Sequence, residues 1–471
     1  MTKTNSNILI APISLTIDEI KNIKKQIASL DWGILLESAD RDHLDSRWSI
    51  FSAEPIANMR TYQGKSCIHQ GNEIFYDHAD PLSLQQNLRE KLFCNQKIET
   101  DLPFTGGVLG YFSYELGYSF ENINNAHKPT GLGLPEMAVG FYNWALIIDH
   151  QQLQHYLVVH KHHGYDQDIR ILWQQRFDWL KKQSLNVTGR ENFTLLSSWQ
   201  ANMTKSQYAD KFSQIQEYIL AGDCYQVNLA QRFQADYAGD EYQAYQRLLA
   251  DNRPPFAAFL RLPEHVILSL SPERFIKLHN NIVETKPIKG TRPRFADLTE
   301  DTISKQALLN SEKDRSENLM IVDLLRNDIG RVCLPGSVSV PKLFAIESFP
   351  AVHHLVSTVV GQLDQSHSSE DLLRACFPGG SITGAPKIRA MEIIAELEPH
   401  HREVYCGSIG YINGDGQSDT NIAIRTLLCY EGTIYCWAGG GLVADSNADA
   451  EYQECFDKVS KILPSLTLLN K

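Results

Sequence analysis

The 471-residue sequence lacks several features that would place it in a common class of protein. No stretch approaches the roughly 18 consecutive apolar residues that a membrane-spanning helix requires. Basic residues are not in excess, because 44 Lys and Arg stand against 56 Asp and Glu, which gives a net charge of −12. Nucleic-acid binding requires clustered positive charge, so we expect neither a membrane nor a nucleic acid as a partner.

The cysteine pattern excludes two further kinds of structure. The sequence has nine cysteines, an odd number, and none of them forms a Cys-x-x-Cys pair. This pattern favours reduced thiols over a disulfide framework or a zinc site. Residues 1–20 contain one short apolar run followed by acids, which is not typical of a signal peptide. We therefore expect a cytoplasmic protein.

The composition suits a large core, and the chain divides into two predicted parts. Hydrophobic residues make up 43% of the sequence and aromatic residues 10%. A polar, turn-rich segment at 181–199 predicts a linker between an N-terminal part, 1–180, and a second part, 200–471. In the first part, "WGILLESAD" predicts a strand, and two apolar runs around "DHQQ" predict a hairpin.

The second part mixes predicted helices and strands. Apolar residues at helical spacing after Thr204 predict a helix that ends at Gly222. Residues 301–329 also predict a helix, whereas "HVILSLSPERFIKL" and "NIVETKPIKG" predict a pair of strands. Three further strands and a closing helix follow. The predicted class is therefore α+β with long antiparallel sheets.

Acidic side chains share one face on each of two predicted helices. Asp314 and Glu317 are three positions apart, as are Glu451 and Glu454, and Lys458 lies one turn further along the second face. Two such faces meeting in the fold would suit Mg²⁺, which prefers oxygen ligands. From spacing alone, two solvated faces paired with Lys or Arg are the commoner arrangement.

The segment "ETKPIKGTRPR" at 284–294 concentrates positive charge in an acidic chain. Strand alternation places Lys289 on the face opposite Lys286. A neutral lysine amine is a nucleophile, and burial or a nearby cation favours the neutral form. An ion-paired or anion-binding lysine is the commoner role of such a residue, so the segment alone leaves both interpretations open.

Two glycine-rich segments, "FPGGSITGAPK" and "WAGGGLVAD", leave backbone amides free to approach an anion. Neither has the spacing of a nucleotide-binding motif, and an ordinary turn with a helix cap explains the first equally well. In "AVHHLVSTVVG", one of His353 and His354 is expected to point inward, where a hydrogen-bonded core histidine is the commoner role.

Taken in order, several segments resemble the chorismate-utilising enzymes: "SPERF", "ETKPIKGTRPR", "SENLMIVDLLRNDIGRV", "HHLVSTVVG", "FPGGSITGAPKIRAMEIIAELEP" and "WAGGGLVADSNADAEYQECFDK". The resemblance extends to "GILLESAD" and "FTGGVLGYFSYELG", so it covers nearly the whole chain. It implies an anthranilate synthase component I-like fold, a large two-sheet antiparallel β-sandwich flanked by helices, with the site between the sheets.

The resemblance also implies roles for individual residues. Glu317 and Glu454 would bind Mg²⁺ directly, and Glu451 and Asp314 would act through water or from a second layer, although the family usually has Glu in place of Asp314. Lys458 would support the metal-bound carboxylate of chorismate. The remaining residues implied to contact chorismate are Thr291, His354, Tyr405, Arg425 and the backbone amides of Gly439, Gly440 and Gly441.

Two positions separate the activities within this family. Members that add water to chorismate carry a Lys where this sequence has Gln226, which argues against them. Anthranilate-forming members resemble "PIAGT", whereas members that form 4-amino-4-deoxychorismate resemble "PIKGT", the form found here. The resemblance thus implies that Lys289 attacks chorismate while Glu273 protonates the departing hydroxyl. Anthranilate formation is the alternative, and an inactive chorismate- or tryptophan-binding regulatory subunit is a third.

Partners follow from the same resemblance. The sequence shows no Cys–His–Glu triad of a glutaminase, so a glutamine amidotransferase subunit is expected to supply ammonia. Glu37 and Ser38 in "GILLESAD" match the tryptophan-pocket motif of the family. The facing segment, "RPPFAAF", departs from the Pro-Tyr-Met type found in feedback-inhibited anthranilate synthases. Tryptophan is therefore expected as a structural ligand rather than as an inhibitor.

Overall fold

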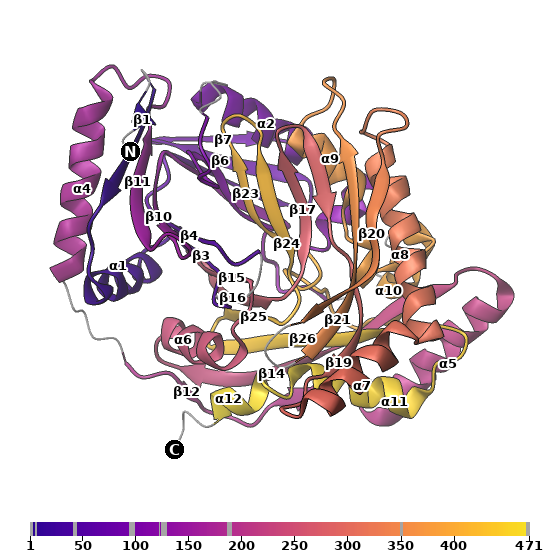
Figure 1. Ribbon diagram of the computed structural model, residues 1–471. Coiled ribbons are helices and arrows are strands. Elements are labelled where there is room, and N and C mark those ends of the chain that lie inside the picture. The colour runs from indigo at the N-terminus through magenta and orange to yellow at the C-terminus, as the bar shows by residue number, and fades with distance from the viewer. Residues whose placement is uncertain are drawn as a thin grey trace.

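Two large antiparallel sheets form the centre of the molecule, and helices surround them (Figure 1). The computed structural model describes residues 3–4, 7–40, 45–93, 99–121, 123, 130–185, 191–348 and 352–467. The predicted α+β class and two-sheet architecture are confirmed. The side chains between the sheets and under the helices form one continuous apolar core, in which Trp144, Tyr111 and Phe141 are almost completely buried.

The larger sheet has 14 strands. β13 (Gln200–Ala201) and β22 (Gly384–Ala385) pair with β14 beside the main path. That path runs from edge to edge through β1 (Lys3–Thr4), β2 (Ile8–Ile13), β11 (Gln154–His160), β10 (Trp144–Asp149), β4 (Trp48–Ser52), β3 (Gly33–Glu37), β15 (Phe256–Arg261), β16 (His265–Ser271), β25 (Thr426–Tyr430), β26 (Thr433–Leu442), β14 (Gln226–Ala238) and β12 (Thr194–Leu195).

The second sheet has 12 strands, and β20 (Ser339–Ser348) pairs with β21 beside its main path. That path runs through β19 (Ile288–Pro293), β21 (Val352–Gln362), β18 (Ile282–Thr285), β17 (Arg274–His279), β24 (Ser418–Ile422), β23 (Ser408–Asn413), β8 (Gly107–Phe112), β9 (Met137–Tyr142), β5 (Ala57–Tyr62), β6 (Lys65–Gln70) and β7 (Glu73–Asp77).

Helices flank both sheets, and none in the described part of the chain is long and apolar enough to cross a membrane. Of those that position the site, α8 packs on β19 and β21, and α11 packs on β26. The helices are α1 (Ile17–Ser29), α2 (Pro81–Leu92), α3 (Leu116–Phe120), α4 (Ile169–Leu185), α5 (Lys205–Ala221), α6 (Glu241–Asn252), α7 (Leu298–Leu309), α8 (Glu312–Gly330), α9 (Ser369–Cys376), α10 (Lys387–Leu397), α11 (Ala448–Val459) and α12 (Leu463–Thr467).

Both sheets continue across the boundary between the two predicted parts. Each part supplies one contiguous half of each sheet, and the halves meet where β3 pairs with β15 and where β8 pairs with β23. Of the predicted linker, residues 181–185 complete α4, residues 194–195 form β12, and residues 186–190 lie outside the described residues. The division at 181–199 stays a prediction.

The predicted helix after Thr204 is confirmed. The Thr204 side chain accepts a hydrogen bond from the Gln207 amide, and α5 ends at Gly222, whose φ of 82° suits glycine. The single helix predicted for 301–329 was wrong, because the chain forms α7 and α8 with a break between them. Ser311 caps α8 by accepting from the Asp314 amide, so a new helix starts there.

Two prolines divide the strands that were predicted to be continuous. Pro272 has no amide hydrogen to donate, and the chain leaves the larger sheet after β16 and enters the second sheet at β17. Pro287 separates β18 from β19 in the same way, although both strands pair with β21. These breaks place Glu273 at the crossing between the two sheets and Lys289 near the start of an irregular strand.

Candidate active site

The structure brings the predicted acid and the predicted nucleophile to the same serine. Ser381 lies in the short 3₁₀ helix η1 (Gly380–Ile382), and its hydroxyl donates a 3.2 Å hydrogen bond to Oε1 of Glu273. The Lys289 Nζ donates a long, 3.5 Å hydrogen bond to the backbone oxygen of Ser381. A carboxyl group from the crossing between β16 and β17 and an amine from β19 therefore approach one residue of the glycine-rich segment.

Burial shifts the pKa values of the Glu273 carboxyl and the Lys289 amine in the directions that favour their uncharged forms. Glu273 is only 5% exposed, and burial raises its pKa to about 7, although the charge of Lys289 and the Ser381 hydrogen bond oppose the rise. Burial also lowers the pKa of Lys289, and the charge of Glu317 opposes that change. A protonated carboxyl beside a neutral amine is the pairing that acid-assisted nucleophilic displacement requires.

Replacing Ser381 by Ala should make Glu273 harder to ionise. The hydroxyl bonds to the charged carboxylate and so lowers its pKa. Without it, the pKa of Glu273 rises further above about 7, and the decline of kcat/KM at alkaline pH should begin at higher pH. We also expect kcat to fall on the order of tenfold, because one hydrogen bond to a charged group is lost. A pH–rate profile of both proteins checks this, and an unmoved decline would contradict it.

The acidic face of α11 lies close to β26, whereas α8, which carries Asp314 and Glu317, packs on β19 and β21. A side-chain carbon added at Gly440 would lie 3.1 Å from Oε2 of Glu451 and 3.4 Å from Oε1 of Glu454. That Oε2 is buried and has no hydrogen-bond partner among the described residues. Burial raises the pKa of Glu317 on α8 and of Glu451 on α11, and the charge of Glu451 raises that of Glu317 further. A buried carboxylate oxygen without a donor beside other acids fits a hard cation.

The metal ligands themselves stay a prediction. In the described part of the chain, no three His, Cys, Asp or Glu side chains lie close enough to one another to hold a metal ion alone. Glu454 forms an ion pair with Lys458 at 2.6 Å, and Asp314 forms one with Arg292 at 3.1 Å. Mg²⁺ commonly takes only one or two carboxylates and completes its shell with water and substrate oxygens, so these contacts leave the expectation open.

The residues predicted to line the ring of chorismate contact one another. Thr291 Oγ1 and His354 Nδ1 lie 2.8 Å apart, on the paired strands β19 and β21. Both neighbouring histidines are buried, rather than one: His353 lies 2.8 Å from the Ser348 hydroxyl and 3.0 Å from an Asp301 oxygen. Of the two, His354 is thus the one joined to a predicted site residue.

At the glycine-rich end of β26, the backbone is paired with a strand on one side only. The pairing with β25 ends at Cys436, so from there to Gly441 the only strand described beside β26 is β14. The Lys458 Nζ donates a 2.8 Å hydrogen bond to the oxygen of Gly439. Gly441 faces Gln226, whose buried side-chain amide has no hydrogen-bond partner in the described structure.

Tyr405 is buried beside β26, and Arg425, which directly precedes β25, is partly buried. The Tyr405 ring stacks against Trp437 of β26, with centroids 6.3 Å apart and planes inclined by 10°. Burial lowers the pKa of Arg425, and the charge of Glu273 opposes this change, so the two side chains are electrostatically coupled. A largely desolvated guanidinium is suited to bind a carboxylate. Their roles in binding chorismate stay predictions.

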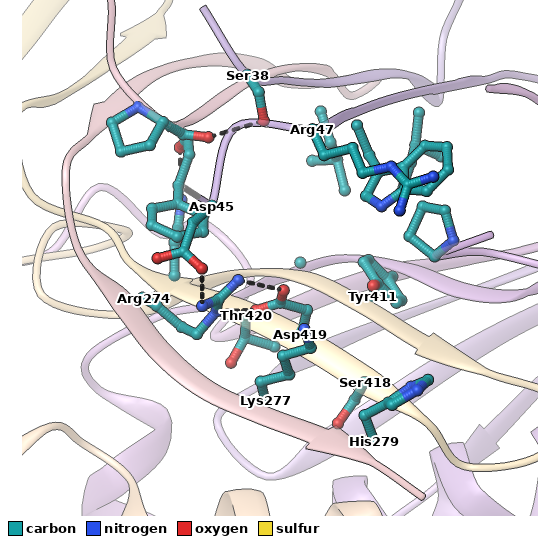
Figure 2. Close-up of a pocket in the computed structure, with 18 of the residues that line it drawn as sticks. Ser38, Asp45, Arg47, Arg274, Lys277, His279, Tyr411, Ser418, Asp419 and Thr420 are labelled. Carbon is teal, nitrogen blue, oxygen red and sulfur yellow. Dashed lines mark hydrogen bonds and ion pairs between the residues drawn. The ribbon is translucent and has the colours of Figure 1, made fainter. Parts of the chain in front are cut away.

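The predicted tryptophan pocket coincides with a cavity of about 390 Å³ that Glu37 and Ser38 help to line (Figure 2). The Ser38 hydroxyl donates a 3.0 Å hydrogen bond to the oxygen of Pro255, in the facing segment. The Glu37 carboxylate is paired with Lys24 of α1. None of the residues predicted to bind chorismate or Mg²⁺ lines this cavity, so the two predicted sites are separate.

Sequence reasoning did not single out two residues that the structure connects to the site. Ser381 lies within the quoted "FPGGSITGAPK", but the glycines of that segment, rather than its serine, suggested an anion site. Asp45 lies far away in the sequence and contacts Arg274, which directly follows Glu273, and Lys286, which lies just before the strand that carries Lys289. No local pattern marks a residue of that kind.

The geometry and the sequence together define the class of protein. Residues 34–464 match the chorismate binding enzyme family, and the chain belongs to this family. Aminodeoxychorismate synthase component 1 of Escherichia coli strain K12 is 52% identical over 94% of each chain. Anthranilate synthase component 1 of Thermus thermophilus is 36% identical over 92% of each. The crystal structure of anthranilate synthase component I from Streptococcus pneumoniae superposes with a TM-score of 0.78 at 30% identity, covering 89% of this chain and 93% of that one.

Proposed function

We propose that this chain is the synthase component of an aminodeoxychorismate synthase, which converts chorismate and ammonia to 4-amino-4-deoxychorismate, a precursor of 4-aminobenzoate and folate. The observation that carries the proposal is the pairing of Lys289 with Glu273 around Ser381. The 52% identity to a relative with that name supports it. Anthranilate-forming members resemble "PIAGT" and have Ala at the position of Lys289, so their reaction does not require an amine there.

The proposed reaction proceeds in two displacements. The neutral amine of Lys289 attacks C2 of chorismate, the two conjugated ring double bonds shift, and the C4–oxygen bond breaks as Glu273 gives its proton to the departing hydroxyl, which leaves as water. Ammonia then adds at C4, both double bonds shift back, and the C2–nitrogen bond breaks to release the Lys289 amine. The proton that the added ammonia loses restores the acid form of Glu273. The enolpyruvyl group stays on the ring, so a separate lyase is needed to form 4-aminobenzoate.

The other site residues would hold the substrate. Thr291 and His354 would lie against the ring, and Arg425 with Tyr405 and the amides of the Gly439–Gly441 segment would bind the enolpyruvyl carboxylate. Glu317 and Glu454, assisted by Glu451 and Asp314, would hold Mg²⁺, and Lys458 would support the metal-bound ring carboxylate of chorismate. Bound Mg²⁺ would neutralise and orient the ring carboxylate of chorismate. Fixing C2 near Lys289 would lower the entropic part of the barrier.

Removing divalent metal should abolish the activity. The reason is that Glu317 and Glu454 would lie beside the ring carboxylate of chorismate. Without a cation, their negative charges would repel that carboxylate. Dialysis against a chelator should lower kcat/KM by about 100-fold or more, and Mg²⁺ should restore it. As a readout independent of turnover, Mg²⁺ should raise the melting temperature of the wild type but not of Glu451→Gln. Equal stabilisation of both proteins would argue against Glu451 as part of the site.

The assay that tests the proposed function combines the chain with chorismate, Mg²⁺ and a high concentration of ammonium, with and without a separate aminodeoxychorismate lyase. We expect 4-aminobenzoate only when the lyase is present. Anthranilate and pyruvate without the lyase would instead support the anthranilate synthase alternative, which the 36% identical relative keeps under consideration. No consumption of chorismate would support an inactive regulatory subunit.

The partners proposed for this chain follow from its relatives' names and its cavity. "Component 1" in the name of the 52% identical relative implies a second component, and we propose that a glutamine amidotransferase subunit supplies ammonia here. For the cavity lined by Glu37 and Ser38, we propose tryptophan as the ligand. Its volume of about 390 Å³ and its mixture of apolar and charged walls suit an aromatic amino acid.

A further inference from the structure

We propose that Asp45 is a positioning residue that fixes both proposed catalytic side chains from outside the catalytic part of the chain. Its carboxylate accepts hydrogen bonds from two cations, each next to a segment that carries one member of the pair. The proposal rests on the proposed function only for the catalytic roles of Lys289 and Glu273. The positioning itself concerns where Lys289 lies and can be measured without turnover.

The first contact of Asp45 leads to Glu273. Asp45 Oδ1 accepts a 2.7 Å hydrogen bond from Arg274, the residue that follows Glu273 and begins β17. Arg274 is 4% exposed and is held on its other side by two hydrogen bonds to Asp419, at 2.9 Å and 3.1 Å, above the ring of Phe256. Figure 2 shows dashed lines from Arg274 to both aspartates. Arg274 is therefore a fixed point in the core.

The second contact of Asp45 leads to Lys289. Asp45 Oδ2 accepts a 3.1 Å hydrogen bond from Lys286, which lies between β18 and β19. In the described chain, Asp45 is the only carboxylate within ion-pair distance of Lys286. Through Asp45, the segment that begins the Lys289 strand is tied to the fixed Arg274.

This tie matters because the sheet alone does not hold Lys289 firmly. Pro287 interrupts the strand two positions earlier, and the register of β19 against β21 shifts between Lys289 and Thr291. Gly290, at the shift, has a φ of 71°, a conformation that few other residues adopt. A strand with a proline break on one side of Lys289 and a bulge on the other needs an additional anchor, and Lys286 with Asp45 provides it.

The electrostatics agree with a fixed, charged Asp45. Burial alone would raise the pKa of its carboxyl, but the charges of Arg274 and Lys286 outweigh burial and hold the pKa well below its usual range. Asp45 thus carries its charge throughout the pH range in which the enzyme would work. A neutral Asn in its place would keep the size of the side chain and lose the attraction to both cations.

The test measures the titration of Lys289 in variants. Each protein is reductively methylated with formaldehyde and cyanoborohydride over a range of pH, and the modification of Lys289 is quantified by mass spectrometry of peptides. In Asp45→Asn and in Lys286→Met, the pH at which half of Lys289 is modified should rise toward the ordinary value for lysine, because the strand loosens and burial of the amine decreases.

The same variants are assayed with chorismate and ammonium. Their kcat should fall about tenfold or more at little change in KM, and Asp45→Glu should recover part of the lost kcat.

The matched control is Asp149→Asn. Asp149 is a completely buried carboxylate in the same N-terminal part and pairs with Arg47 at 2.8 Å, and none of the hydrogen bonds described for its side chain is with β17 or β19. In Asp149→Asn, the modification midpoint of Lys289 should stay at the wild-type value. In the double variant Asp45→Asn/Lys286→Met, this midpoint should shift no more than in either single variant. The proposal is overturned if the midpoint is unchanged in both single variants, or moves equally in Asp149→Asn. A shifted midpoint in a protein without turnover would overturn the proposed function and leave the positioning role intact.

Discussion

Replacing Lys289 by Ala should lower the ammonium-dependent rate by about 100-fold or more. The amine is the proposed nucleophile, and burial already lowers its pKa, so the wild type holds part of it neutral and reactive. Without it, ammonia must displace the hydroxyl in one step, which is the harder reaction that covalent catalysis avoids. Steady-state kinetics with saturating chorismate and Mg²⁺ measure this effect.

The control variant Lys289→Arg separates nucleophilic from electrostatic roles. A guanidinium keeps the positive charge beside Glu273 but does not deprotonate near neutral pH, so it cannot attack carbon. The account therefore predicts that Lys289→Arg is as inactive as Lys289→Ala. If Arg restored most of the rate, Lys289 would act through its charge, and the covalent step would be wrong. Lys305→Ala, at an exposed position on α7, should be almost unaffected.

Replacing Glu273 by Gln should lower kcat by about 100-fold to 10,000-fold, the range expected for loss of a general acid. Glutamine has nearly the same shape and keeps the hydrogen bond from Ser381, but it has no proton of comparable acidity to give to the departing hydroxyl. The exposed Glu264→Gln serves as a control and should keep the wild-type rate. A Glu273→Gln protein with wild-type kcat would contradict the acid role.

The same residue sets the sign of the pH dependence. Glu273 acts in its protonated form, and burial raises its pKa to about 7, so the fraction of enzyme that can donate this proton falls as pH rises through about 7. The amine of Lys289 acts in its neutral form, so its own titration changes the rate in the opposite direction and increases it as pH rises. Glu273→Gln should lose the alkaline decline while the low residual rate still follows Lys289. An alkaline decline unchanged in Glu273→Gln would assign it to another group.

Much of the fold could be predicted because the patterns involved are local. The helix between Thr204 and Gly222 has its cap, spacing and end within one segment, and all three appear in the structure. The breaks at Pro272 and Pro287 were missed, since a proline within an apolar run signals a weak strand without saying that the chain changes sheet. The consequence of these breaks, the meeting of Glu273 and Lys289, depends on both sheets at once.

The candidate site shows the same contrast. Lys289 stood out through its position in "PIKGT", and the acids of the last helix stood out through their spacing. Ser381 and Asp45 each contact two segments that are far apart from them in the sequence, and such contacts leave no periodicity to detect. Asp314 shows the limit of spacing, because its distance from Glu317 along the helix suggests a shared ligand face but does not reveal that its carboxylate pairs with Arg292.

The most direct test of the account is the position of nitrogen in the product. The chain is supplied with chorismate, Mg²⁺ and ¹⁵N-labelled ammonium, with no lyase, and the product is analysed by mass spectrometry and NMR. The account predicts ¹⁵N on C4 of a ring that keeps its enolpyruvyl group, with no pyruvate released. A product that carries ¹⁵N on C2, or anthranilate with an equal amount of pyruvate, would contradict the proposed function.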